Sequence, residues 1–176
     1  MRKIVLYIAI SLDGKIADTE GSVDWLESLP NPDQNDYGYP ALLDRVDTTI
    51  MGNATYRQVL SFPIEFPYKD KKNFVITRNA ELVEDEYATF VFSDHITFIQ
   101  ELKQQVGKDI WLIGGAEVNT LLNQSDLIDE YMVFVMPIIL GKGIPLFSDH
   151  QSMKRLQLIE NKRYKSGASL LHYRNN

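Results

Sequence analysis

Short apolar runs rich in Val, Ile, Tyr and Phe recur along the whole chain and alternate with segments of helical character. Runs of this length and composition are typical of buried strands. We predict strands at Ile4–Ile10, Thr48–Met51, Asn73–Ile76, Ala88–Phe92, Asp109–Ile113, Tyr131–Met136, Arg155–Lys162 and Ser169–Arg174. The segments between them predict helices at Tyr39–Arg45, Ala54–Leu60, Ile96–Val106 and Ala116–Leu122, with Asp94 capping the third. This alternation favours an α/β fold, in which helices cover both faces of a mostly parallel sheet with an antiparallel C-terminal edge hairpin.

The length of 176 residues is in the usual range for one domain. No internal repeat or linker interrupts the pattern, and Pro30–Asn35 and Pro137–Pro145 read as surface loops. We therefore expect a single domain that spans residues 1–176.

Composition and charge exclude several classes of function. The net charge of −6 argues against a general nucleic-acid binder or a protein of anionic membranes, because phosphate attraction needs clustered Lys and Arg. The chain has no cysteine, and His95, His150 and His172 lack ligand spacing, so we predict no metal site. The apolar run Ile4–Ile10 is followed by Ser11–Lys15 instead of a signal-peptide cleavage site. No run approaches the roughly 20 apolar residues that span a bilayer, so we expect no membrane partner and a cytoplasmic location.

Two predicted strands lead into helices through glycine. The first turn is Met51-Gly52-Asn53-Ala54-Thr55, and the second is Gly114-Gly115-Ala116-Glu117. Glycine allows close approach of a ligand to the backbone, and free N–H groups at a helix start suit a phosphate. The alternative is an ordinary connection, with Asn53 as an N-cap and the Gly-Gly pair as a tight turn. Neither segment is the G-x-G-x-x-G fingerprint, so a Rossmann assignment is excluded.

Two further segments could serve a ligand. Thr77-Arg78 follows an apolar strand, and Arg binds phosphate bidentately, although an Arg in this place is often only solvated. Asp13-Gly14 can close a turn, and the loop Ala17–Trp25 that follows is either purely structural or a mobile flap over a ligand.

These segments, in this order, resemble the dihydrofolate reductase superfamily, above all the C-terminal reductase domain of the bifunctional riboflavin-biosynthesis deaminase–reductase and its stand-alone bacterial relatives. The resemblance runs from Ile4 to about Tyr173. Its most specific parts are Ser11–Ala17, Met51–Tyr56, Leu112–Glu117, Asp129-Glu130 and Pro137–Phe147. It implies a dihydrofolate-reductase-like three-layer sandwich that binds NADPH, and usually a homodimer.

The same resemblance assigns parts of the cofactor to residues. The backbone around Ala9 and Ile16 would meet the nicotinamide. The turn Gly52–Thr55 and the pair Gly114-Gly115, commonly joined by a cis peptide and followed here by Ala116 and Glu117, would hold the pyrophosphate. Thr77 and Arg78 would meet the adenosine 2′-phosphate. The family usually has Arg directly after the glycine of the first turn, where this chain has Asn53, so weak cofactor discrimination is the alternative to NADPH preference.

The residues predicted to bind the substrate are Trp25 and Asp36. Asp36 stands sixteen residues before Gly52, where folate reductases carry a catalytic carboxylate. An acid there could orient a ring N–H and help to protonate the imine. The alternative is that Asp36 caps a helix beginning near Tyr37.

The loop containing Lys142 is typical of the riboflavin branch, whose substrate is a phosphoribosylamino-pyrimidine. Lys15, Lys142 and Arg57 are candidates for binding its phosphate.

We therefore expect an NADPH-dependent reductase that transfers hydride to a pterin-like or pyrimidine-like heterocycle. Its type would be either the riboflavin-pathway 5-amino-6-(5-phosphoribosylamino)uracil reductase or dihydrofolate reductase. A non-catalytic dinucleotide-binding module on the same fold is the alternative. An interaction protein, with only the apolar stretch Met132–Leu140 in its favour, is a third.

Overall fold

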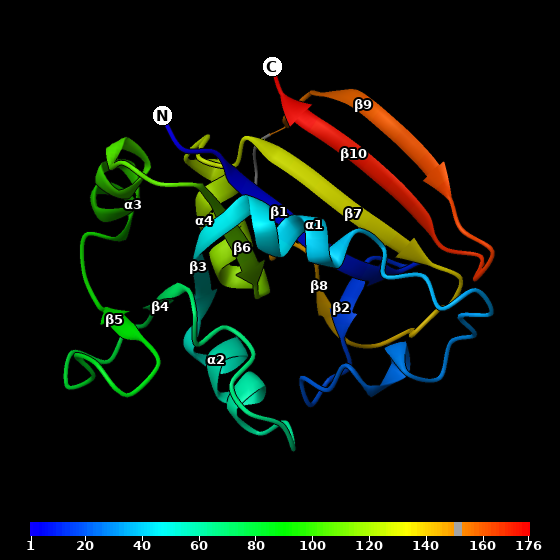
Figure 1. Cartoon of the computed structure of the whole chain (residues 1–176), viewed down its shortest axis with the longest axis horizontal. Helices are drawn as coiled ribbons and strands as arrows, with labels where there is room; N and C mark the ends of the chain where they lie inside the picture. Colours follow the sequence, from blue (N-terminus) through cyan, green and yellow to red (C-terminus); the bar gives the residue numbers. More distant parts are fainter. Residues whose placement is uncertain (150–152) are drawn as a thin grey trace.

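An eight-stranded sheet forms the centre of the computed structural model, which describes residues 1–149 and 153–176 (Figure 1). Its strand order is β5-β4-β3-β6-β1-β7-β10-β9. The strands are β1 (Ile4–Ser11), β3 (Val46–Gly52), β4 (Lys72–Ile76), β5 (Thr89–Val91), β6 (Asp109–Gly114), β7 (Glu130–Met136), β9 (Leu156–Arg163) and β10 (Ser169–Asn175). All pairs from β5 to β7 are parallel, while β10 is antiparallel to both of its neighbours. The expected mostly parallel sheet with an antiparallel C-terminal hairpin is confirmed.

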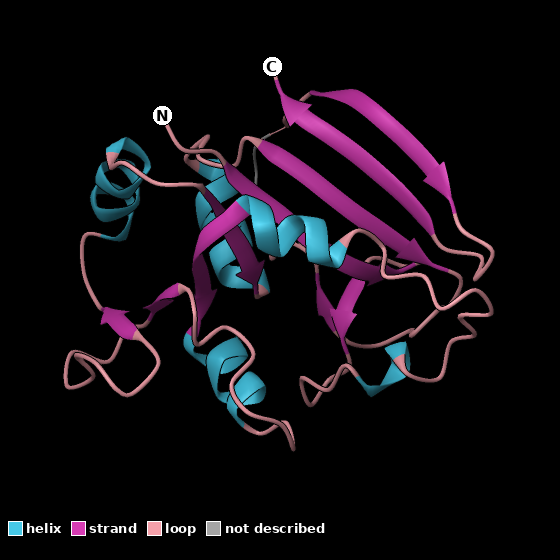
Figure 2. Cartoon of the chain, viewed as in Figure 1, coloured by secondary structure: helices cyan, strands magenta, loops and turns pink. Residues whose placement is uncertain are grey.

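Helices cover both faces of this sheet (Figure 2). They are α1 (Tyr39–Arg45), α2 (Asn53–Leu60), α3 (His95–Gln104) and α4 (Ala116–Gln124), with a 3-10 turn at Asp24–Leu26. The buried side chains of α1 and α2 belong to one apolar cluster, and those of α3 and α4 to another. The molecule therefore has three layers.

The sequence of the central strand β1 is apolar at successive positions because both faces of the strand are buried. Ile4 and Leu6 pack into the cluster of α3 and α4, whereas Val5 packs into the cluster of α1 and α2. All three side chains are fully buried. Because neighbouring side chains on a strand point to opposite faces, a strand covered on both sides has no solvent-facing polar positions.

Some local expectations need correction. The loop Pro137–Pro145 contains a short strand, β8 (Ile144–Pro145), which pairs with β2 (Lys15–Ala17) in a separate two-stranded sheet. Asp94 precedes α3 as expected, but it has φ +49° and its side chain makes no capping hydrogen bond. A left-handed residue at that place does not aim its carboxylate at the first N–H groups.

Two expected absences can be examined only for the described residues. Within residues 1–149 and 153–176, none of the helices combines the length and apolar character needed to cross a membrane. Over the same ranges no three His, Asp or Glu side chains gather in a way that could hold a metal ion. His150 lies outside the described residues.

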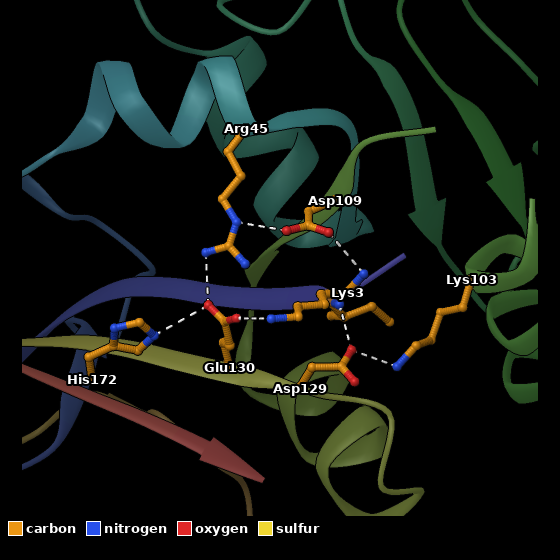
Figure 3. Close-up of polar contacts among 8 residues, drawn as sticks. Lys3, Arg45, Lys103, Asp109, Asp129, Glu130 and His172 are labelled. Carbon is orange, nitrogen blue, oxygen red and sulfur yellow. Dashed lines mark hydrogen bonds and ion pairs between the residues drawn. The ribbon is translucent and has the colours of Figure 1, made fainter. Parts of the chain in front are cut away.

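A network of charges joins the elements at the amino ends of β1, β6 and β7 (Figure 3). The buried Glu130 carboxylate accepts hydrogen bonds from Arg45 on α1 and from the Lys3 ammonium, each at 2.8 Å. His172 Nε2 on β10 lies 3.3 Å from the same carboxylate. Arg45 also donates to Asp109 on β6 at 2.7 Å. One carboxylate thereby connects three segments that are far apart in the sequence.

The partners of Glu130 decide its charge state. Burial by itself disfavours the ionised carboxylate, but the hydrogen bonds from Arg45 and Lys3 outweigh this and lower the pKa of Glu130 from 4.5 to about 2.

A hollow of about 350 Å³ opens beside this network and is lined by Lys3, Asp129, Glu130 and Arg174 among others. Lys3 and Glu130 pair with each other, and Asp129 pairs with Lys103.

Replacing Glu130 with Gln is expected to lower the free energy of unfolding at pH 7 by about 2–3 kcal/mol, because charge-assisted hydrogen bonds are lost in a buried place. Since the folded-state pKa is depressed, the stabilisation is present above pH 4.5 and is lost as the pH falls towards about 2. Urea unfolding followed by circular dichroism at several pH values measures the difference.

Glu65→Gln is the matched control, because Glu65 pairs with Lys69 on the exposed surface. Exposed pairs contribute at most about 1 kcal/mol. A loss for Glu130→Gln that equals the control, or that does not shrink between pH 4.5 and 2, would contradict this account.

Candidate functional site

The parallel strands bring the two glycine turns together at their carboxyl ends. In the β3–β6 pair Met51 stands opposite Gly114, and in the β3–β4 pair Gly52 stands opposite Ile76. A β-carbon added to Gly52 would lie 3.9 Å from Gly115 N and 3.2 Å from Val118 Cγ2. The turns are therefore direct neighbours, at the edge of an α/β sheet where ligands usually bind.

The Gly114-Gly115 pair has the geometry that the resemblance implies. Its peptide bond is cis, and Gly114 has φ +122°, a region that residues with side chains rarely adopt. A β-carbon on Gly115 would lie 3.3 Å from Thr55 Oγ1 and 3.8 Å from Ile16 Cδ1. A side chain at position 115 would thus lie between the first turn and β2.

Both helices that start at these turns have N-caps without a side-chain oxygen. Gly52 is the N-cap of α2 and Gly115 is the N-cap of α4, and neither helix has a side-chain capping hydrogen bond. The interpretation of Asn53 as N-cap is therefore wrong, because Asn53 is the first helical residue. The N–H groups of the first turns are left for another acceptor, and an anion such as a pyrophosphate suits them.

We call the two glycine turns, Gly52–Thr55 and Gly114–Glu117, the cradle. The residues expected to bind the adenosine lie beside it. Thr77 follows β4, is buried, and donates its N–H to Val91 O at 3.0 Å. Arg78 is exposed, and its guanidinium is 3.6 Å from Glu117 Oε2 on the first turn of α4. Ala116 is buried at the start of that helix. The structure thus gathers the expected phosphate-binding positions from three elements.

One polar group beside the Gly-Gly turn escaped the sequence reasoning. Asn119 is fully buried and donates to Leu146 O at 3.0 Å, but its Oδ1 has no hydrogen-bond partner among the described residues. A β-carbon on Gly114 would lie 3.5 Å from this oxygen. Buried acceptors are usually paired, so the turn carries unused hydrogen-bonding capacity. The sequence does not single it out, because Thr120 and Asn123 are also polar and buried on α4.

These observations fit a dinucleotide. Two turns adjoin in which a β-carbon on Gly52 or Gly115 would lie 3.2 or 3.3 Å from a neighbouring side chain. Two helix starts offer free N–H groups, and an unpaired acceptor lies beside Gly114. Gly52 and Gly115 with Thr55 would hold a pyrophosphate, while Ile16 would border the reactive ring.

The loop after β2 contacts α2, the helix that follows the first glycine turn. Asp18 Oδ1 accepts the N–H groups of Glu20 and Ser22 at 2.8 and 2.9 Å, which closes a tight turn. Gln58 on α2 donates to Gly21 O at 2.5 Å. The segment expected to be either structural or a flap thus contacts the helix that follows the first glycine turn.

Asp13 fixes the base of this loop. It accepts hydrogen bonds from the Ser11 hydroxyl at 2.7 Å and from the N–H groups of Leu140 and Gly141 at 3.0 and 2.8 Å. These bonds, the Ser11 bond first, lower the pKa of Asp13 to about 2. The carboxylate connects the turn after β1 to the loop 137–145.

Aromatic side chains surround the expected substrate side. Ala9 and Trp25 pack against one apolar cluster, which also includes Phe134 and the flanking Tyr37 and Tyr164. The Tyr37 ring centroid lies 5.9 Å from that of Phe134 and 4.9 Å from that of Tyr164. Trp25 Nε1 is buried without a hydrogen-bond partner among the described residues. The structure therefore places Ala9 and Trp25 in the same surroundings, suited to a flat ring.

Asp36 lies at the rim of this cluster and is exposed. Its Oδ1 accepts the N–H of Gly38 at 2.8 Å. The expected cap of a helix beginning near Tyr37 is wrong, because α1 begins at Tyr39 and its N-cap is Gly38. Burial, followed by the nearby Tyr164, Tyr39 and Asp36, raises the pKa of Tyr7. Asp36 thus adds a small part to the field that keeps the Tyr7 hydroxyl protonated.

The three residues expected to bind a substrate phosphate lie in two separate places. Lys15 is on β2, and Lys142 is in the loop leading to β8, the strand with which β2 pairs. Arg57 is exposed on α2. The β2–β8 sheet brings the two lysine-bearing segments together and leaves Arg57 on a separate element.

Comparison with known proteins decides the family. The sequence matches the RibD C-terminal domain family over residues 2–170. This chain belongs to that family. The resemblance stated from the sequence is therefore confirmed, and with it membership in a family of reductases. The uncharacterized protein YwjB of Bacillus subtilis (strain 168) is 41% identical over 172 residues, which cover 98% of this chain and 97% of YwjB.

Solved structures agree on the fold. A Shewanella sp. PV-4 protein provisionally assigned to riboflavin biosynthesis matches with a TM-score of 0.88 and 35% identity, covering 100% of this chain and 99% of that chain. The deaminase and 5-amino-6-(5-phosphoribosylamino)uracil reductase of Thermotoga maritima matches with a TM-score of 0.72 and 18% identity. That match covers 99% of this chain but 57% of the longer protein, and it shows a RibD reductase-like fold.

Replacing Gly115 with Ala is expected to weaken NADPH binding about tenfold, which corresponds to about 1.4 kcal/mol. The added methyl group would lie 3.3 Å from Thr55 Oγ1, in the space between the two turns. Isothermal titration calorimetry measures the dissociation constant. Gln104→Ala is the control, since Gln104 is exposed at the end of α3, which precedes the amino end of β6, whereas both turns lie at carboxyl ends of strands. Unchanged NADPH affinity in Gly115→Ala would place the cofactor elsewhere.

Proposed function

We propose that this protein is an NADPH-dependent reductase that transfers hydride to a pyrimidine-like or pterin-like heterocycle. The observation that carries the proposal is the pair of adjoining glycine turns, each starting a helix without a side-chain cap, at the carboxyl edge of the sheet. Membership in the RibD C-terminal domain family supports the same reading. When bound, the nicotinamide cofactor supplies the hydride.

The chain's own residues bind and orient the cofactor. The N–H groups that follow Gly52 and Gly115 donate hydrogen bonds to the pyrophosphate, with Thr55 as a hydroxyl donor. Ala9 and Ile16 border the nicotinamide ring. Few side chains need to be chemically active in such a reaction, which accords with a site built mostly of backbone and aromatic groups.

On the substrate side, the aromatic cluster around Trp25 and Tyr37 stacks on the heterocycle and excludes water. Asp36 at its rim orients a ring N–H and assists protonation of the imine that receives the hydride. Lys15 and Lys142 favour a phosphorylated substrate, because Lys15 is on β2 and Lys142 is in the loop that leads into its partner strand β8. The substrate proposed first is therefore the phosphoribosylamino-pyrimidine of the riboflavin pathway, with dihydrofolate second.

A non-catalytic dinucleotide-binding module is the second candidate. It is favoured by Asp36, whose carboxylate is exposed and already bonded to Gly38 N. The two candidates share the cradle and differ only in turnover. The expected homodimer and cytoplasmic location are also proposals. Light scattering on the purified protein tests the dimer, which would have twice the monomer mass.

Mixing the protein with NADPH and either the ribosylamino-pyrimidine or dihydrofolate is expected to give a loss of absorbance at the NADPH wavelength. Asp36→Asn is expected to lower kcat by about 100-fold or more while NADPH affinity stays the same. The Asn oxygen can still accept the Gly38 N–H, so the turn should persist.

Asp33→Asn is the matched control, since Asp33 is exposed in the same acidic loop. It should turn over like the wild type. Binding of NADPH without oxidation by either substrate would favour the non-catalytic module, and equal losses in both variants would remove the role of Asp36.

A further inference from the structure

Arg78 and Glu117 form an ion pair across the adenosine end of the cradle. Arg78 follows β4 and the buried Thr77, whereas Glu117 stands two residues after Gly115 on α4. The guanidinium Nη2 and the carboxylate Oε2 are 3.6 Å apart, and the two side chains are 88% and 78% exposed. No other carboxylate within residues 1–149 and 153–176 pairs with Arg78.

This pair sets the charge at the place where a dinucleotide would present its adenosine ribose. Asn53, at the start of α2, is neutral, so Arg78 supplies the positive charge and Glu117 supplies an equal negative charge. A 2′-phosphate would meet a cation whose charge is already offset. It would also lie near a carboxylate, and two like charges repel.

The ribose of NADH has a hydroxyl at the same position. A carboxylate accepts a hydrogen bond from such a hydroxyl, and acidic residues recognise it this way in dinucleotide sites, while Arg accommodates the 2′-phosphate. Glu117 can therefore recognise the 2′-hydroxyl of NADH, and Arg78 can recognise the 2′-phosphate of NADPH.

We propose that Glu117 determines coenzyme selectivity and makes the site accept NADH as well as NADPH, with dissociation constants within about tenfold of each other. Glu117 does this by offsetting Arg78 and by accepting the ribose 2′-hydroxyl. This inference rests on the proposed function, because it presupposes a dinucleotide in the cradle.

The test compares NADPH and NADH binding by isothermal titration calorimetry at low salt. Glu117→Gln frees Arg78 and is expected to tighten NADPH binding about tenfold and to leave NADH binding unchanged or weaker. Glu101→Gln on the exposed side of α3 removes the same charge elsewhere and should change neither affinity more than about twofold. In the double variant Arg78→Ala/Glu117→Gln the gain for NADPH should disappear.

The outcomes separate this inference from the proposed function. A selectivity ratio in Glu117→Gln within twofold of the wild type would overturn the role of Glu117, as would a wild-type preference for NADPH beyond about tenfold. An equal gain in Glu101→Gln would also overturn it, since the effect would then be one of net charge. If the wild type binds neither dinucleotide at millimolar concentration, the proposed function fails, and the selectivity role fails with it.

Discussion

The buried carboxylate of Glu130 is the interaction on which the arrangement of the sheet depends. It bonds Arg45 of α1 and Lys3 ahead of β1, and it lies against His172 of β10. A buried charge is tolerated only with good partners, so any shift of these elements would leave it poorly solvated. Towards the carboxyl ends of β3 and β6 the register shifts between Ile50 and Met51, and this shift sets Met51 opposite Gly114.

That register produces the candidate site at the other end of the same strands. With Met51 opposite Gly114, the two glycine turns adjoin, and a β-carbon on Gly52 or Gly115 would lie 3.2 or 3.3 Å from a neighbouring side chain. The site therefore relies on backbone N–H groups and shape more than on charged side chains. Side-chain charge enters at Arg78 and Glu117, where the proposed effect is on the choice of dinucleotide and not on the two turns themselves.

The sequence predicted much of this structure, for physical reasons that also explain its misses. Runs such as Ile4–Ile10 are apolar at successive positions because helices cover both faces of the strand, and that pattern is visible in the chain itself. The β2–β8 pair was missed, because strands of three and two residues joined over a long separation leave no local periodicity. Asp94 has the residue type of a cap but not the backbone conformation. Asn119 matters only through its distance from Gly114, which a sequence does not show.

The central claim is that a nicotinamide dinucleotide binds across the two glycine turns. Titration of the 15N-labelled protein with NADPH, followed through its backbone amide resonances, tests it most directly. The account predicts that the largest shifts occur at the N–H groups of Gly52, Gly115 and the first turns of α2 and α4. Shifts confined to the opposite end of the sheet, around Lys3 and Asn175, or no shifts at millimolar NADPH, would contradict it.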